Sequence, residues 1–242
     1  MHAEHSGGKP HIEQAIELAG CHIPYRLRRS SRRRTIALLI DDRGLQVAAP
    51  LRASQGAIDA LLREHATWVI RKFGDWQRKR PLPRRWIAGE EIMLRGSALT
   101  LEPCPGIVRT RQDGERLLVN AALEATATEA AVHRWLKDEA LTYFTIRCEN
   151  YCTQLGLPVP AVRLSNARTR WGSCHAAGRI RMNWRLIQMP ETWIDYVAAH
   201  EVAHLRQMNH SPAFWQTVAT LVPDHRERRA ALRRDAHRYL LP

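Results

Sequence analysis

Residues 200–210 read His-Glu-Val-Ala-His-Leu-Arg-Gln-Met-Asn-His, and this segment constrains the chain more than any other. On a helix, His200 and His204 are four residues apart and point from the same face, with their Cβ atoms about 6 Å apart. Neutral imidazoles bind Zn²⁺ at about 2.0–2.1 Å. Glu201 lies beside the first histidine, where it can reach a metal-bound water without being a ligand itself. The spacing therefore predicts a catalytic zinc site with a glutamate as general base.

The motif is predicted to lie on a helix that spans residues 189–208. Pro190 suits the first helical position, and an apolar stripe follows at helical spacing, formed by Ile194, Ala198, Val202 and Leu205. The two histidines lie off this stripe, whereas histidines buried in a core would more often interrupt it. One face of the helix is thus expected to pack while another carries the ligands. By composition, a chance match to the motif is expected only roughly 0.04 times in such a chain.

His210 is the candidate third ligand, because a catalytic zinc usually takes three protein ligands and leaves one position open. Asn209 is interpreted as a left-handed residue that ends the helix, and Ser211 followed by Pro212 as the cap and first residue of the next helix. His210 would then lie in a tight corner that can bring it to the metal. The alternative is a histidine in a surface loop.

The composition is that of a globular protein: 242 residues, 45% of them hydrophobic. No apolar stretch approaches the roughly 20 residues that span a bilayer, and residues 1–20 lack the apolar core of a signal peptide. Five scattered cysteines suit a reducing compartment, so we expect a soluble, cytoplasmic protein without membrane contact. Cys148 and Cys152, one helical turn apart, are expected to be core residues rather than metal ligands.

The formal charge is +13, and 33 of the 37 basic residues are arginine. Arginines cluster at residues 26–34, 78–85 and 226–234 and could contact a nucleic acid or a nucleotide. The alternative is a solvated surface, because the excess charge is shared by both halves of the chain without a basic tail.

The pattern of elements predicts an α+β fold with a flexible tail (residues 1–20), a small β-rich N-terminal domain with a helix (21–124) and a hydrolase domain (125–242). In the N-terminal domain (21–124), a helical pattern is expected between Ser54 and Phe73. Strands are expected there at 23–27, 35–40, 45–48, 91–94, 98–102, 107–111 and 116–119. In the hydrolase domain (125–242), a long helix is expected to end near Gly156, and two strands follow at 162–165 and 179–184. The metal helix comes next, followed by a helix at 211–221 and a last helix after Asp224. Strands just before the metal helix could hold an extended peptide by β-augmentation.

Five segments carry a resemblance to a known family: Arg168–Cys174, Asn183–Leu186, Tyr196–Val197, His200–His210 and Phe214–Trp215. On these segments the chain resembles the YgjP-like metallopeptidase family, which is related to the SprT-like zinc peptidases. The resemblance is close over residues 160–222 and weaker upstream, in Ser30–Arg34 and Trp68–Lys72. It implies a zincin-like fold, a single zinc ion held by His200, His204 and His210, and Glu201 as catalytic base. It departs in residues 94–98, which lack the expected aromatic residues.

Arg168 and Arg170 are candidates for contacting the substrate or stabilising a developing oxyanion, and Trp171 for contacting the substrate. The alternative for Trp171 is a core anchor, with Gly172 supplying turn geometry and Cys174 a small buried residue. Cys174 beside His175 lacks any further sign of an activated thiol. Asp195 or Asp224 could orient a ligand imidazole, and His175 and His225 are expected on the surface.

Three functions fit these residues. The first is a zinc metallopeptidase that acts on polypeptides. The second is a metal-dependent hydrolase of nucleotides, of the nucleoside triphosphate pyrophosphatase type, in which arginines hold the phosphates. The third is a nucleic-acid-associated protein with a structural metal site, which Glu201 argues against, since a structural site requires no base beside its ligands.

Overall fold

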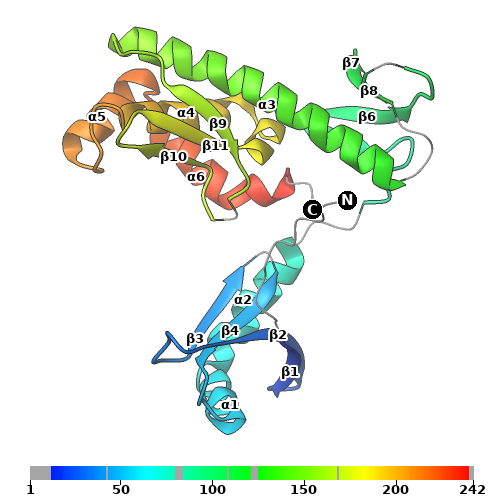
Figure 1. The fold of residues 1–242 in the computed structure, drawn as a ribbon, viewed down its shortest axis with the longest axis vertical. Helices are drawn as coiled ribbons and strands as arrows, with labels where there is room; N and C mark the ends of the chain where they lie inside the picture. The colour runs from blue at the N-terminus through cyan, green and yellow to red at the C-terminus, as the bar shows by residue number, and fades with distance from the viewer. Residues whose placement is uncertain are drawn as a thin grey trace. The chain divides into compact units, whose positions relative to one another are not determined.

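The structure is a computed structural model that describes residues 12–41, 43–79, 84–107, 109–120, 125–167 and 169–239. It is a mixed α and β protein with three small sheets (Figure 1). The chain divides into two compact units, residues 1–80 and 81–242. No helix among the described residues is long and apolar enough to cross a membrane.

The first unit is a four-stranded sheet followed by two helices. Its strands are β1 (Ile12–Leu18), β2 (Cys21–Ser30), β3 (Ala37–Asp41) and β4 (Gly44–Pro50), in the order β1-β2-β4-β3. β2 and β4 are parallel, and the other two pairs are antiparallel. The helices α1 (Gln55–Glu64) and α2 (Ala66–Lys79) supply Ile58, Leu62, Val69 and Phe73 to a core shared with the sheet.

The second unit begins with another four-stranded sheet, formed by β5 (Glu91–Leu94), β6 (Ser97–Pro103), β7 (Arg111–Asp113) and β8 (Arg116–Val119). The long helix α3 (Ala125–Leu155) follows. It is terminated by the next residue, Gly156, whose positive φ of 64° favours glycine. A three-stranded sheet comes next, with β9 (Ala161–Ser165), β10 (Gly172–His175) and β11 (Arg179–Asn183) in the order β10-β11-β9. β10 therefore forms one edge of this sheet.

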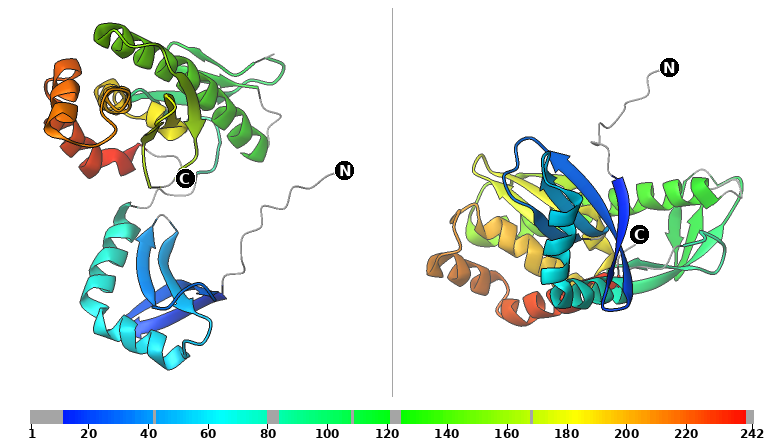
Figure 2. Two further views of the ribbon diagram at one scale, coloured as in Figure 1. Left: turned by 60° about the vertical axis from the view of Figure 1, so that its left-hand side comes forward. Right: turned by 90° about the horizontal axis from the view of Figure 1, so that it is seen from below.

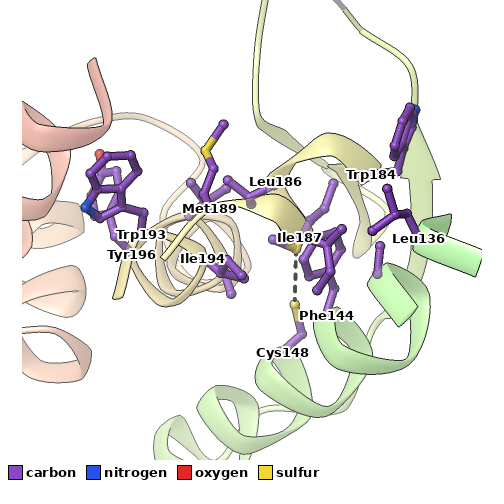
Figure 3. Packing of buried hydrophobic residues seen from close by; sticks show 14 of the residues in the cluster. Leu136, Phe144, Cys148, Trp184, Leu186, Ile187, Met189, Trp193, Ile194 and Tyr196 are labelled. Carbon is purple, nitrogen blue, oxygen red and sulfur yellow. Dashed lines mark hydrogen bonds between the residues drawn. The ribbon is translucent and has the colours of Figure 1, made fainter. Parts of the chain in front are cut away.

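The chain then enters a short 3₁₀ helix, η1 (Trp184–Gln188), and the helices α4 (Glu191–Ala203), α5 (Pro212–Leu221) and α6 (His225–Asp235), with η2 (Ala236–Arg238) at the end. α4 lies at the centre of the unit and packs against α3, α5, α6 and β10 (Figure 2). Figure 3 shows Phe144 of α3 next to Ile187 of η1, with Ile194 of α4 in the same cluster. The Cys148 thiol of α3 points toward the sulfur of Met182 in β11, 3.9 Å away. These contacts fix the helix that carries the histidine motif.

The predicted domain boundaries are wrong in two places. Residues 12–18 belong to strand β1 rather than to a tail, because Ile16 and Leu18 are buried in the core of the first unit. The division falls after residue 80, not after residue 124. Strands β5–β8 belong to the second unit, since Ile92, Leu101 and Leu117 pack in one core with residues of α3.

Several predicted elements also differ in detail. The strand expected at 107–111 is replaced by β7 at 111–113, and β10 was not anticipated. The helical pattern after Ser54 forms two helices, because α1 ends at Glu64 before α2 begins at Ala66. The cysteine pair is confirmed as core: Cys148 and Cys152 are buried in α3, and burial raises the pKa of Cys148 to about 12.

Candidate metal centre

α4 presents His200 and His204 on one face while its apolar face is buried. Ile194, Ala198 and Val202 are fully buried, as the stripe predicted. The helix is shorter than predicted, ending at Ala203 rather than at residue 208. His204 is its C-cap with helical dihedral angles, so the four-residue spacing of the two histidines still places them on the same side.

A tight corner after α4 brings His210 back to these two histidines. The chain turns through backbone bonds from Leu205 N to Val202 O (3.0 Å) and from Gln207 N to Ala203 O (3.0 Å). Asn209 is not in a left-handed conformation, contrary to the prediction. Its Oδ1 instead accepts a bond from Ser211 N (3.2 Å), which shapes the turn into α5.

Ser211 and Pro212 start α5 as predicted. The Ser211 hydroxyl accepts a hydrogen bond from Phe214 N (3.4 Å), and Pro212 occupies the first turn. Phe214 is fully buried beneath the three histidines, with ring centroids 4.5–4.9 Å from theirs. The corner and this aromatic floor hold the three imidazoles together.

One ligand atom from each of His200, His204 and His210 lies within 4.8 Å of the others, and no other group of three such donors occurs among the described residues. His200 Nε2 and His210 Nε2 are 3.2 Å apart. Two nitrogens bound tetrahedrally to one zinc ion at about 2.0–2.1 Å would be about 3.3 Å apart. The spacing of this pair therefore suits two ligands of one metal ion, and the three histidines together could hold one.

The outer nitrogens of the imidazoles differ in their partners. His204 Nδ1 lies 3.0 Å from the carbonyl of Gln207, which can accept its proton and leave Nε2 free for a metal. His200 Nδ1 is buried without a hydrogen-bond partner among the described residues. Neither Asp195 nor Asp224 orients a ligand: Asp195 pairs with Arg147 (2.6 Å), and Asp224 with Arg228 (2.8 Å).

The electrostatic setting favours the neutral form of His200 and His204, which is the form that binds a metal. Burial, followed by the charges of His204 and His210, lowers the pKa of His200 to about 3. Burial also lowers the pKa of His204, although its bond to Gln207 opposes this shift. Protons therefore do not compete for these nitrogens near neutral pH.

Glu201 is a buried carboxylate beside the cluster, with 5% of its surface exposed. Its Oε2 has no hydrogen-bond partner among the described residues. Burial raises its pKa to about 8, and the positive charge of Arg170 only partly opposes this effect. A carboxylate held in this way without a partner is poised to interact with a group that enters the site.

Gly172 of β10 leaves room for Glu201. A Cβ atom at residue 172 would lie 2.6 Å from Cγ and 2.7 Å from Cδ of Glu201, and closer still to Oε1. The predicted reason for this glycine, turn geometry, is wrong, since Gly172 lies in a strand without a positive φ. Glycine is required because the edge of β10 and the carboxylate approach each other closely.

A cavity of about 230 Å³ adjoins Glu201 and His200. Three elements line it: the start of β10 with the residues before it, α4, and α6. The described lining residues are Arg170, Trp171, Gly172, Tyr196, Val197, His200, Glu201, Arg229, Leu232 and Arg233. The cavity is therefore the open approach to the candidate centre.

Of the three residues predicted to contact the substrate, two line this cavity. Arg168 lies outside the described residues. Arg170 is exposed and lines the cavity, with its charge acting on Glu201. Trp171 lines the same cavity and is half-buried against the core, so its position is compatible with both alternatives.

Cys174, His175 and His225 were the remaining residues with a sequence-based interpretation. Burial, and then the charge of Glu201, raises the pKa of the Cys174 thiol to about 11, which argues against a nucleophile. His225 is buried rather than on the surface, because it stacks on Trp215 with ring centroids 5.7 Å apart. His175 is exposed as expected.

Sequence reasoning missed Arg229 and Arg233 as parts of the site. Their spacing of four residues on a helix predicts that they share a face, but it does not say what this face meets. Tyr196 also lines the cavity, and the family resemblance was the only sequence signal that pointed to it.

Three convergent imidazoles with a buried carboxylate beside them define a candidate centre of a metal-dependent hydrolase. The family model described as "YgjP-like, metallopeptidase domain" matches residues 34–235, and the chain belongs to this family. The chain is thus a metal-dependent hydrolase of the metallopeptidase class.

No curated protein matched the chain. Among solved structures, the crystal structure of the metallopeptidase zymogen of Pyrococcus abyssi abylysin is similar at 23% sequence identity, with a TM-score of 0.35. That match covers 38% of this chain and 94% of the other.

Proposed function

We propose that the protein is a zinc metallopeptidase that hydrolyses peptide bonds, with His200, His204 and His210 as metal ligands and Glu201 as general base. The observation that carries this proposal is the convergence of three imidazoles next to a buried carboxylate whose Oε2 has no hydrogen-bond partner among the described residues. Zinc in catalytic sites takes three protein ligands and keeps one position open, whereas structural sites are closed by four. Zinc bound here would polarise a carbonyl and acidify a water molecule.

Glu201 has the protonation chemistry that a general base needs. Its burial favours the protonated carboxyl, while a cation among the neighbouring imidazoles would favour the carboxylate. Because the two effects oppose each other, a bound cation would bring the raised pKa of Glu201 down toward neutral pH, where a general base works best. Glu201 accepts a proton from the attacking water and then passes it to the leaving amine.

The edge of β10 is proposed to hold the substrate backbone. β10 pairs with β11 on one side and with no other described strand, and Gly172 at its start borders Glu201. An extended polypeptide can add to such an edge through main-chain hydrogen bonds. Trp171 forms one wall of the approach, Arg170 stabilises charge that develops on the carbonyl oxygen, and Arg168 remains a candidate for the same role. We propose that this arrangement corresponds to the zincin-like fold that the resemblance implies.

Loss of a ligand tests the metal assignment. We expect His200→Ala and His204→Ala to bind zinc at least about 100-fold more weakly, because even partners that only orient a ligand are worth 10–100-fold. Mass spectrometry of metals in the purified proteins should find about one zinc per chain in the wild type and almost none in either variant. His175→Ala, an exposed histidine outside the cluster, is the matched control and should keep its zinc. Equal zinc in all four proteins would contradict the assignment.

Hydrolysis of nucleoside triphosphates is the second candidate function. The observation that favours it is the set of arginines in the cavity, Arg170, Arg229 and Arg233, since guanidinium groups bind phosphates. Incubation of the zinc-loaded protein with unfolded polypeptides and, separately, with the common nucleoside triphosphates distinguishes the two. We expect cleavage of the polypeptides.

A further inference from the structure

Two arginines of α6 face the candidate centre. Arg229 and Arg233 are four residues apart, and both line the cavity that contains Glu201 and His200. We call them the α6 arginine pair. Arg229 also lines a second, larger hollow of about 580 Å³ between α5 and α6, so it lies where the two cavities adjoin.

The α6 arginine pair has no acidic partner among the described residues. Other arginines of the same helix and its end are paired: Arg228 with Asp224, and Arg234 and Arg238 with Asp235. In the cavity lining, three arginines face a single acidic residue, Glu201. The cavity therefore has an excess of positive charge before any metal is added, and a bound zinc would increase it.

Arg229 is exposed, but its guanidinium contacts an aromatic ring. Its guanidinium carbon lies 5.1 Å from the ring centroid of Trp215, in a cation–π contact. Trp215 in turn stacks on the candidate ligand His210, at 5.8 Å between ring centroids, and on the buried His225. The guanidinium is thus tied to the metal cluster through one aromatic ring, which lowers the entropy cost of binding an anion.

We infer that the α6 arginine pair is a carboxylate-binding subsite, and that the enzyme prefers peptides with a carboxylate close to the scissile bond. This inference rests on the proposed peptidase function. A guanidinium matches a carboxylate in shape and charge and can bind both of its oxygens. The remaining lining, with Trp171, Tyr196, Val197 and Leu232, is largely apolar and suits the aliphatic part of a glutamate. The carboxylate belongs to an acidic side chain or to the C-terminus of the peptide.

Cleavage-site profiling tests the inference. The zinc-loaded wild type is incubated with a peptide library made from a digested proteome, half of it amidated at the C-terminus, and the new ends are identified by mass spectrometry. We expect Asp and Glu, or a free C-terminus, within three residues of the cleaved bond at least about fivefold above background. In the Arg229→Gln/Arg233→Gln variant this enrichment should fall below about twofold. Arg234→Gln, on the same helix outside the cavity, should keep it.

The amidated half separates the two sources of the carboxylate. Enrichment of Asp or Glu that persists in amidated peptides assigns the subsite to side chains, and enrichment only in free peptides assigns it to the C-terminus. Cleavage without either enrichment, or enrichment that the double variant retains, overturns the subsite and leaves the peptidase function standing. Absence of cleavage would overturn the peptidase function instead.

A binding measurement decides the subsite independently of turnover. Zinc-loaded Glu201→Gln protein is titrated in a calorimeter with acetyl-Ala-Glu-Ala-amide, with acetyl-Ala-Gln-Ala-amide, and with acetyl-Ala-Gln-Ala that has a free C-terminus. We expect at least one of the two carboxylate peptides to bind about tenfold more tightly than the neutral one, and the added double substitution to remove this difference. Equal binding, or no binding by any of them, overturns the subsite. Stronger binding of adenosine triphosphate than of both carboxylate peptides would also overturn it, in favour of a phosphate site.

Discussion

Replacing Glu201 by glutamine is expected to leave the zinc in place and to lower kcat by about 10²- to 10⁴-fold, the usual contribution of a general acid–base group. The amide has the shape of the carboxylate but cannot accept the proton of the attacking water. Because the side chain is buried without a hydrogen-bond partner among the described residues, the neutral amide should also fold without loss of stability. Initial rates on an unfolded protein substrate, together with metal analysis, measure both effects.

Glu227→Gln is the matched control for this substitution. Glu227 is an exposed residue in the first turn of α6 and does not line the site cavity. Its replacement removes the same charge and should leave the rate within about twofold, as expected for a surface change outside the site. Full activity of zinc-replete Glu201→Gln protein would refute the role of Glu201.

Replacing Gly172 by alanine is expected to disable the site from a residue that carries no reactive group. The new methyl group would lie within 3 Å of three atoms of Glu201, so the carboxylate, the strand or both must move. Overpacking of this kind costs about 1–3 kcal/mol of stability. A misplacement of about 1 Å in a catalytic group costs about 100-fold in rate. Chemical denaturation and initial rates on the zinc-loaded variant measure the two losses.

A double-mutant cycle shows whether the contact with Glu201 is the cause. Glu201→Ala removes the atoms that the new methyl group would meet, so Gly172→Ala should cost much less stability in that background. The same cost in both backgrounds would mean that Gly172 is required for another reason.

The convergence of the three histidines could be predicted from the motif and its flanking residues because the relevant distances are local. His200 and His204 share a helical turn, and Ser211 with Pro212 starts the next helix, so the position of His210 follows from a short corner. The end of the metal helix was less predictable. Leu205 continues the apolar stripe, yet the backbone turns at His204.

Features that depend on contacts distant in sequence were not predictable. The β5–β8 strands have the same short, turn-bounded pattern as the strands before residue 50, and only their packing on α3 assigns them to the second unit. Gly172 is explained by a residue 29 positions later in the chain. The α6 arginine pair has the composition of a solvated face, and the packing of α6 on α4 is what brings it to the cavity.

The most direct test of zinc-dependent peptide hydrolysis with Glu201 as base is a zinc titration of metal-stripped protein, with an unfolded polypeptide as substrate. We expect no cleavage without metal, a rise in the cleavage rate that is complete at about one zinc per chain, and no comparable rise in the Glu201→Gln variant. Cleavage that is unaffected by stripping the metal, or that rises equally in the variant, would contradict this mechanism.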